Sequence, residues 1–291
     1  MLALNHPLND ETTGSTRLGG DLRVRRLGFG AMRLTGRGIW GEPADLESAR
    51  EVLVRAVRLG VNLMDTADSY GPEVSERLTG ETLYPYPEGL VIATKGGQTR
   101  PGPGRWVPDG RHEHLRRACE GSLRRLRLDR IDLYQLHRVD PNVPLEESLG
   151  ALADLRAEGK IRHVGVSNVS VTQLERARQL LPIVSVQNRY NLTDRRSESV
   201  VDYCERHGLA FLPWAPIAAG DLAAPGGLLD RIAERHRAGT GQVALAWLLR
   251  RSPALLPIPG TSSVEHLLEN LAAPLVPLTD AEADELTRRG R

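Results

Sequence analysis

Four side chains that can move protons stand at the ends of three successive strand-like runs. Asp65 ends the second run and Tyr70 follows it, Lys95 ends the third, and His137 ends the fourth. The ends of neighbouring parallel strands converge when a barrel closes, so we expect these four side chains to meet. A buried Lys beside an Asp stays charged and lowers the pKa of a nearby phenol from about 10. Tyr70 would then be a general acid near neutral pH.

Each of the four also has an ordinary structural interpretation. Asp65 could cap a helix, Tyr70 could pack, Lys95 could extend its ammonium to solvent, and His137 could be a satisfied polar residue. Four such residues at one rim are harder to explain in this way. Lysine is also scarce, since the 38 Lys and Arg include only Lys95 and Lys160. Because lysine shifts its pKa on burial and arginine does not, we expect a chemical reason for Lys95 and none for Lys160 at the opposite rim.

The elements that must position these side chains alternate between strand-like and helix-like runs, the pattern of a parallel sheet wrapped by helices. The predicted strands are Leu27–Gly30, Val61–Asp65, Leu90–Lys95, Ile131–His137, Ile161–Val166, Ile183–Gln187, Ala210–Trp214 and Leu255–Pro259. The predicted helices are Asp45–Leu59 (capped by Asp45, with Gly60 beyond its end), His112–Leu126, Leu145–Glu158, Val171–Leu180, Ser197–Arg206, Gly241–Arg251, Val264–Leu271 and a surface helix, Leu278–Arg289. Eight strand–helix units of about 36 residues predict an α/β fold, the (β/α)8 TIM barrel.

A short β-hairpin is predicted before the first unit, where Thr16–Leu18 and Leu22–Val24 flank two glycines and an aspartate, and it could plug the bottom of the barrel. No Ser/Gly/Pro-rich linker divides the chain, so we expect one domain over residues 1–291, with a flexible N-terminus over residues 1–15. The longest irregular segments should wall a pocket at the carboxyl ends of the strands. They are Arg33–Pro43, Gly96–Asp109, Val139–Val143 and Ala215–Leu228.

Composition excludes several other classes of protein. A net charge of +1, without clustered basic excess, predicts no nucleic-acid partner. Cys119 and Cys204 offer no disulfide framework, which fits a reducing cytoplasm. We expect no membrane association, because the chain lacks a leader-like start and a run of about 18 apolar residues. The eight histidines show no metal-ligand spacing, and Gly28-Phe-Gly30 lacks the third glycine of a Rossmann phosphate loop, so no metal and no Rossmann domain are expected.

The sequence resembles the aldo-keto reductases from about Leu27 to Asn270. The resemblance is carried by VNLMDTADSYG (61–71), IATKGG (92–97), IDLYQLH (131–137), IRHVGVSN (161–168) and VSVQN (184–188). It implies that Tyr70 protonates a carbonyl oxygen as hydride arrives from a nicotinamide. It also implies that Lys95 and Asp65 depress the pKa of Tyr70 and that His137 orients the carbonyl. The resemblance further implies that the binding partner is a small-molecule carbonyl substrate. We expect the protein to be a monomer or a weak homo-oligomer.

The resemblance also implies a cofactor site. Ser167, Asn168 and Gln187 would surround the nicotinamide carboxamide, and Trp214 stands where the family stacks a Tyr on the ring. The full set of implied cofactor contacts is Gly30, Met32, Asp65, Ser167, Asn168, Gln187, Trp214, Pro216, Gly260, Thr261, Ser262, His266, Glu269 and Asn270. Two positions depart from the family pattern, since Gly260 and His266 stand where Lys and Arg are common at the 2′-phosphate. We expect NADPH, and NADH is not excluded.

Local strings such as RLGFGAM (26–32) and QVALAWLLR (242–250) resemble a narrower branch that contains bacterial pyridoxal reductases. The expected substrate contacts are Met32, Trp40, Tyr70, Trp106, His137, Arg138 and Trp214, a mostly aromatic lining. Pyridoxal or another flat aromatic or polycyclic carbonyl is the leading substrate. The alternatives are a secondary-metabolite or sugar ketone, and a cofactor-binding sensor like the potassium-channel β-subunits. A barrel hydrolase or lyase using Asp65 and His137 would leave Ser167, Asn168 and Gln187 without a purpose.

Overall fold

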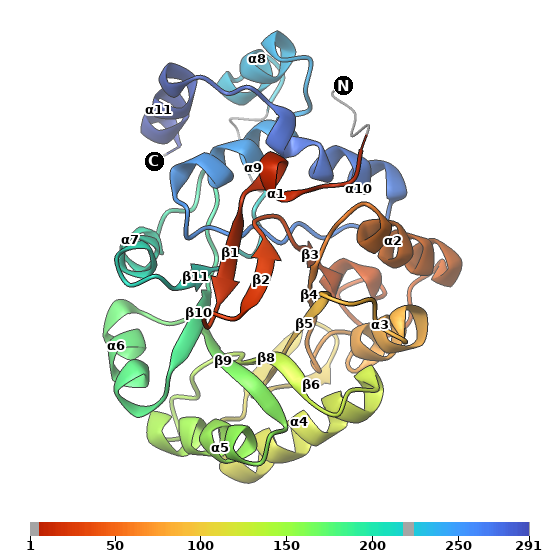
Figure 1. Ribbon diagram of the computed structural model, residues 1–291, viewed down its shortest axis with the longest axis vertical. Coiled ribbons are helices and arrows are strands. Elements are labelled where there is room, and N and C mark those ends of the chain that lie inside the picture. Colours follow the sequence, from red (N-terminus) through yellow and green to blue (C-terminus); the bar gives the residue numbers. More distant parts are fainter. Residues whose placement is uncertain (1–5, 218–223, 291) are drawn as a thin grey trace.

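The computed structural model describes residues 6–217 and 224–290, and they form a parallel sheet curled into a barrel inside a ring of helices (Figure 1). Seven strands are regular in this part of the chain and pair in the order β3 (Phe29–Gly30), β4 (Leu63–Asp65), β5 (Val91–Gly96), β8 (Ile131–Leu136), β9 (Ile161–Ser167), β10 (Ile183–Gln187) and β11 (Ala210–Phe211). The surrounding helices are α2 (Leu46–Arg58), α3 (Val74–Leu83), α4 (His112–Leu126), α5 (Leu145–Ala157), α6 (Val171–Leu180), α7 (Glu198–Arg206), α9 (Thr240–Arg251) and α10 (Val264–Leu271). The predicted TIM barrel is confirmed.

The eighth side of the barrel differs from the prediction. Leu255–Pro259 is not a regular strand, although it closes the gap between β11 and β3. The amide of Leu256 donates to the Phe211 carbonyl at 2.8 Å, and the amide of Gly28 donates to the Pro257 carbonyl at 2.9 Å. Pro257 and Pro259 have no N–H, so this segment cannot donate a full ladder of hydrogen bonds.

Most predicted helices lie where expected, and α2 begins at its predicted cap, where the Asp45 carboxylate accepts from the Ser48 amide at 2.9 Å. Helix α3 was not predicted. It buries Ser75, Glu76 and Thr79 against the barrel, so it lacks the apolar period that reveals an amphipathic helix. The prediction also missed α8 (Leu228–Arg235), which begins where the predicted irregular segment Ala215–Leu228 ends, and residues 218–223 of that segment lie outside the described residues. Inside Gly96–Asp109, also predicted to be irregular, it missed a hairpin, β6 (Gln98–Gly102) with β7 (Arg105–Pro108).

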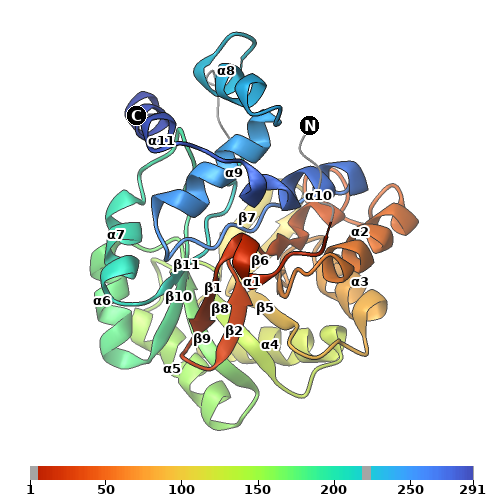
Figure 2. The same cartoon turned by 45° about the horizontal axis from the view of Figure 1, so that its top comes forward.

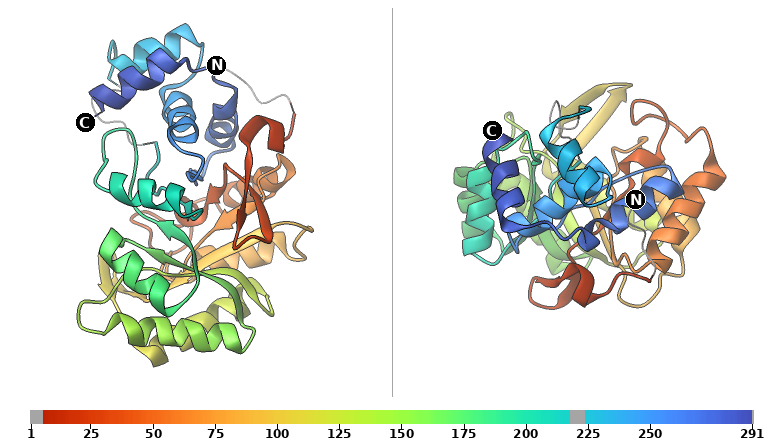
Figure 3. Two further views of the ribbon diagram at one scale, coloured as in Figure 1. Left: turned by 60° about the vertical axis from the view of Figure 1, so that its left-hand side comes forward. Right: turned by 90° about the horizontal axis from the view of Figure 1, so that it is seen from above.

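The predicted N-terminal hairpin is confirmed as β1 (Ser15–Leu18) and β2 (Leu22–Arg25). Leu18, Leu22 and Val24 pack in one buried cluster with residues of the barrel interior, including Val91 at the start of β5. Figure 2 shows this hairpin in front of the strands, and the right panel of Figure 3 shows it at the opposite end of the barrel from β6 and β7. Part of the terminus expected to be flexible is a helical turn, α1 (Asp10–Thr13), capped by Asn9.

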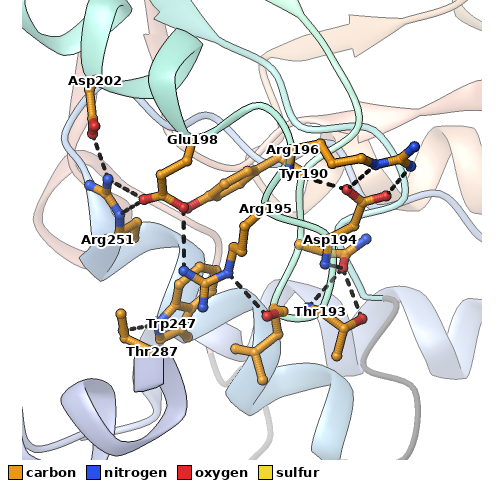
Figure 4. Close-up of polar contacts among 12 residues, drawn as sticks. Tyr190, Thr193, Asp194, Arg195, Arg196, Glu198, Asp202, Trp247, Arg251 and Thr287 are labelled. Carbon is orange, nitrogen blue, oxygen red and sulfur yellow. Dashed lines mark hydrogen bonds and ion pairs between the residues drawn. The ribbon is translucent and has the colours of Figure 1, made fainter. Parts of the chain in front are cut away.

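The final helix, α11 (Asp280–Arg289), lies beside α8 outside the ring (left panel of Figure 3). Close by, a partly buried polar cluster links the loop after β10 to α7 and α9. Figure 4 shows Glu198 between the phenol of Tyr190, which donates at 2.9 Å, and the guanidinium of Arg251. Arg195 lies over the Trp247 ring at 4.0 Å. None of the described helices is long and apolar enough to cross a membrane.

Close packing of α3 on α4 gives a test of the barrel wall. A Cβ added at Gly80 would overlap the Arg125 carbonyl oxygen, whereas one added at Gly150 in α5 would meet nothing within 4 Å. We expect Gly80→Ala to lower the free energy of unfolding by about 1–3 kcal/mol, the usual cost of overpacking. The matched control, Gly150→Ala, should raise it by about 0.5–1 kcal/mol. Urea unfolding checks both, and equal effects at the two sites would contradict the close approach.

Candidate active site

The side chains of Asp65, Lys95 and Tyr70 meet at the carboxyl ends of β4 and β5. Lys95 is fully buried, and its ammonium donates to an Asp65 oxygen at 2.6 Å, to the Thr66 carbonyl at 2.8 Å and to the Tyr70 phenol oxygen at 3.3 Å. An ammonium has three hydrogens to donate, so each has an acceptor. The buried charge is paired, and the phenol oxygen is held beside it.

The second oxygen of Asp65 is also bound from across the barrel. The side-chain amide of Gln187 on β10 donates to it at 2.9 Å, and that of Gln135 on β8 donates at 3.2 Å. A buried carboxylate is tolerated when its lone pairs are filled in this way. Asp65 therefore links four strands of the barrel at the level of the phenol.

The pKa of the Tyr70 phenol departs from the expectation. Burial disfavours the phenolate and raises the pKa above 10, and this effect outweighs the lowering caused by Lys95. Burial also disfavours the Lys95 ammonium, but Asp65 and Tyr70 together raise the pKa of that lysine. The predicted lowering of the Tyr70 pKa is thus wrong in direction. Both groups hold their protons at neutral pH.

His137 lies edge-on to Tyr70, with ring centroids 5.8 Å apart. Its Nδ1 is 3.2 Å from the Ser69 hydroxyl. Burial, together with the charges of Lys95 and Arg138, holds its pKa well below 6.5, so the imidazole is neutral. A neutral imidazole has one donor and one acceptor nitrogen, and Ser69 occupies Nδ1. In the part of the chain that is described, Nε2 has no hydrogen-bond partner.

A cavity of about 430 Å³ opens over Tyr70 and His137. A second of about 430 Å³ leads from Tyr70 towards Gly30 and Gly260. The two cavities share Met32, Tyr70, Gln187 and Trp214, so they meet at the phenol. We name the first the substrate cavity and the second the groove.

Trp214 separates the two spaces and is held on several sides. Its indole N–H donates to the Asn168 side-chain oxygen at 3.2 Å, and the Arg189 guanidinium lies 5.4 Å from its ring centre. Asn168 in turn donates to the His137 carbonyl at 3.2 Å and to the Ser167 hydroxyl at 2.9 Å. An indole therefore provides a flat face and a hydrogen-bond donor at this position.

Comparisons with known proteins agree with this arrangement. A family model described as the aldo/keto reductase family matches residues 26–289. The chain is 50% identical to an uncharacterized oxidoreductase of Schizosaccharomyces pombe, over 97% of this chain and 92% of that protein. It is 42% identical to pyridoxine 4-dehydrogenase of Escherichia coli, over 90% and 93%.

The chain belongs to the aldo-keto reductase family. Its fold is also similar to a solved aldo-keto reductase of Klebsiella pneumoniae in complex with NADPH, with a TM-score of 0.77 and 27% identity over 94% of each chain. This is a family of oxidoreductases that act on carbonyl substrates, and relatives in it bind nicotinamide cofactors.

The residues expected to act in this aldo-keto reductase are catalytic candidates, cofactor contacts and substrate contacts. The four catalytic candidates, Asp65, Tyr70, Lys95 and His137, lie together. Of the expected cofactor contacts, Gly30, Met32, Asp65, Gln187, Trp214 and Gly260 line the groove, and Ser167 and Asn168 line the substrate cavity. Pro216, Thr261, Ser262, His266, Glu269 and Asn270 are not among the lining residues, and their contacts stay predictions.

Six of the seven expected substrate contacts line the substrate cavity: Met32, Tyr70, Trp106, His137, Arg138 and Trp214. Trp40 is not among the lining residues, where the preceding Ile39 stands, and its ring lies 5.5 Å from the Arg100 guanidinium. Its substrate contact stays a prediction. Of the segments expected to wall the pocket, Val139–Val143 lines a separate cavity beside α6.

Sequence analysis missed Gln98, Pro108, Ser69 and Gln135 at the site. Gln135 carried a usable signal, because it stands two residues before His137 and alternate residues of a strand share a face. Ser69 lies inside the 61–71 motif. No three His, Cys, Asp or Glu side chains of the described residues lie close enough to hold a metal ion.

The two lysines of the chain test the buried ion pair. Lys160 is partly exposed and pairs with Glu120 at 2.7 Å and Glu158 at 2.9 Å. We expect Lys95→Met to lower the free energy of unfolding by about 3–5 kcal/mol, because it leaves Asp65 buried and unpaired. Lys160→Met should cost less than about 1 kcal/mol. Urea unfolding measures both. A similar small loss at the two positions would show that Asp65 does not depend on Lys95.

Proposed function

We propose that this chain is an NADPH-dependent reductase that converts an aldehyde or ketone to the alcohol, with Tyr70 as proton donor. The observation that carries the proposal is the buried phenol, hydrogen-bonded to Lys95, where the substrate cavity meets the groove. A proton donor at that junction can serve a carbonyl in the cavity and a nicotinamide that enters from the groove.

The groove suits a dinucleotide. A Cβ at Gly30 or at Gly260 would overlap a backbone carbonyl, so the two segments approach closely and leave bare backbone at the groove. The α10 helix begins just beyond, with Ser263 as its cap, and its first amides form a favourable place for a phosphate. Ser167, Asn168 and Gln187 offer the hydroxyl and amide groups that a carboxamide needs, and Trp214 offers a flat face.

The reaction divides between the cofactor and the chain. The nicotinamide, when bound, supplies the hydride. Tyr70 gives its proton to the carbonyl oxygen as negative charge develops there, and Lys95 stabilises the phenolate that results. If the Ser69 hydroxyl donates to Nδ1 of His137, then Nε2–H is free to donate to the same carbonyl oxygen. Because the pKa of His137 is low, its imidazole stays neutral, as this hydrogen-bonding role requires.

The walls of the substrate cavity favour a flat substrate. Met32, Ile39, Trp106, Pro108 and Trp214 give it apolar and aromatic surfaces, and Gln98 and Arg138 add polar groups. Its volume of about 430 Å³ suits a small aromatic molecule. The 42% identity with pyridoxine 4-dehydrogenase also supports pyridoxal, or an aromatic aldehyde of similar shape, as the substrate.

The proposal is tested by following NADPH absorbance with pyridoxal, substituted benzaldehydes, sugar ketones and polycyclic ketones. We expect turnover with flat aromatic aldehydes. Tyr70→Phe should reduce kcat by about a hundredfold or more, because it removes the general acid, while the Kd for NADPH stays near its original value. Tyr84→Phe is the matched control, since Tyr84 is 50% exposed and is not among the residues that line the substrate cavity or the groove.

Tight NADPH binding without turnover over the whole panel would contradict the reductase and favour a cofactor-binding sensor. Full turnover by Tyr70→Phe would contradict the assignment of Tyr70 as the proton donor.

The preference for NADPH over NADH has a separate test. Arg33 is the one Lys or Arg among the described residues that line the groove, and its stem lies 3.7 Å from the point where a Cβ of Gly260 would be. If Arg33 binds the 2′-phosphate, Arg33→Ala should raise the Kd for NADPH about tenfold, the loss of one charge-assisted contact, and leave that for NADH unchanged. Arg37→Ala, at an exposed site outside the lining, is the control. Isothermal titration measures both cofactors, and tighter binding of NADH by the unmodified chain would contradict the preference.

A further inference from the structure

Arg100, on β6, occupies a place that the proposed chemistry does not explain. The residue is 8% exposed, and its guanidinium donates to four backbone carbonyls. Nε donates to Arg105 at 3.1 Å, Nη1 to Ile39 at 2.9 Å and Ser69 at 3.1 Å, and Nη2 to Gly38 at 3.3 Å. These acceptors belong to three segments that are far apart in the sequence: the loop after β3, the loop that carries Tyr70, and the β6–β7 hairpin.

The charge of Arg100 has no carboxylate partner in residues 6–217 or 224–290. Its guanidinium lies 3.7 Å from the ring centre of Trp106 and 5.5 Å from that of Trp40. Burial lowers the pKa of the Arg100 guanidinium. A planar cation between carbonyls and aromatic faces uses the fixed fork of a guanidinium, which an ammonium cannot reproduce.

Trp106 connects Arg100 to the proposed proton donor. Its ring lies edge-on to Tyr70, with centroids 6.4 Å apart, and edge-on to His137 at 6.3 Å. A second connection runs through Ser69, whose carbonyl accepts from Arg100 and whose hydroxyl lies 3.2 Å from His137. Arg100 thus contacts the wall beside the phenol and the backbone behind the imidazole without touching either ring.

We propose that Arg100 is a positioning residue that fixes Trp106 against Tyr70 and His137 and so sets how a carbonyl lies in the substrate cavity. This inference rests on the proposed reductase function. Trp106 needs such support because it stands on a two-stranded hairpin outside the barrel, and isolated hairpins are only marginally stable. The stacked guanidinium and its bonds to Ile39 and Ser69 bind that hairpin to the rim of the barrel.

The first test compares Arg100→Met, Arg100→Lys and the control Arg105→Met, which removes an exposed guanidinium from the same hairpin. We expect kcat/KM for an aromatic aldehyde to fall at least about tenfold in both Arg100 variants, mainly through KM, because small displacements around a reacting group are costly. Arg105→Met should match the original chain. The Kd for NADPH should stay within about twofold, since Arg100 does not line the groove.

A double-mutant cycle with Trp106→Ala separates positioning from a general loss of stability. If Arg100 acts through Trp106, Arg100→Met should lower kcat/KM much less in the Trp106→Ala background than in the original chain. Trp106→Ala alone, which keeps the Arg100 guanidinium, should raise KM in the same way even if Arg100→Met fails to fold. Additive effects, or full activity of Arg100→Lys, would overturn the inference. Absence of turnover in the original chain would overturn the proposed function instead.

Discussion

The ion pair between Lys95 and Asp65 is the contact on which the mouth of the barrel depends. Taking two charges out of water costs several kcal/mol for each, roughly, and the cost is offset only when geometry and hydrogen bonds are nearly complete. Here the ammonium has three acceptors, and the carboxylate has donors from β5, β8 and β10. The strands must stay in register to keep these contacts. The same contacts that place the phenol therefore also hold the barrel closed at that level.

A second constraint comes from backbone that approaches backbone. A Cβ at Gly260 would overlap the Gly30 carbonyl oxygen, and one at Gly30 would overlap the Ile258 carbonyl oxygen, so neither position has room for a side chain. The prolines at 257 and 259 interrupt the last side of the barrel. The result is a groove whose surface near the phenol is largely main chain. A lysine at position 260 has no room in this arrangement, so in the proposed cofactor site positive charge for a phosphate would come from a neighbouring segment, such as that of Arg33. The departure of Gly260 from the family pattern thus has a steric cause.

Sequence periodicity predicted the barrel because most strands and helices bury one continuous apolar surface. The four catalytic candidates were predictable for a related reason: Asp65, Lys95 and His137 stand at or next to strand ends, Tyr70 lies in the loop that follows one, and parallel strands end together. Helix α3 was missed because Glu76, fully buried, satisfies its charge with Arg125 and Thr94 from other elements. Because Arg125 and Thr94 are distant in the sequence, the residues around Glu76 give no sign of these contacts. The place of Trp40 was harder to predict, since an aromatic residue in a pocket loop can contact a ligand or, as this ring does, a neighbouring guanidinium.

The Tyr70 pKa shows how a correct set of residues can carry a wrong electrostatic inference. Lys95 was expected to lower it, but the Lys95 charge is largely compensated by Asp65 at 2.6 Å, and burial then favours the neutral phenol. The Lys95 charge still favours the phenolate, and the lysine also fixes the position of the phenol. A phenol has one hydrogen to donate, and its oxygen accepts from Lys95 at 3.3 Å, so the O–H of Tyr70 is free to point away from the ammonium. Tyr70 lines both the substrate cavity and the groove, so in the proposed reaction its O–H lies where the two spaces meet. In the proposed reaction the phenol keeps its proton until the carbonyl oxygen gains charge, and the Lys95 ammonium beside it then stabilises the phenolate.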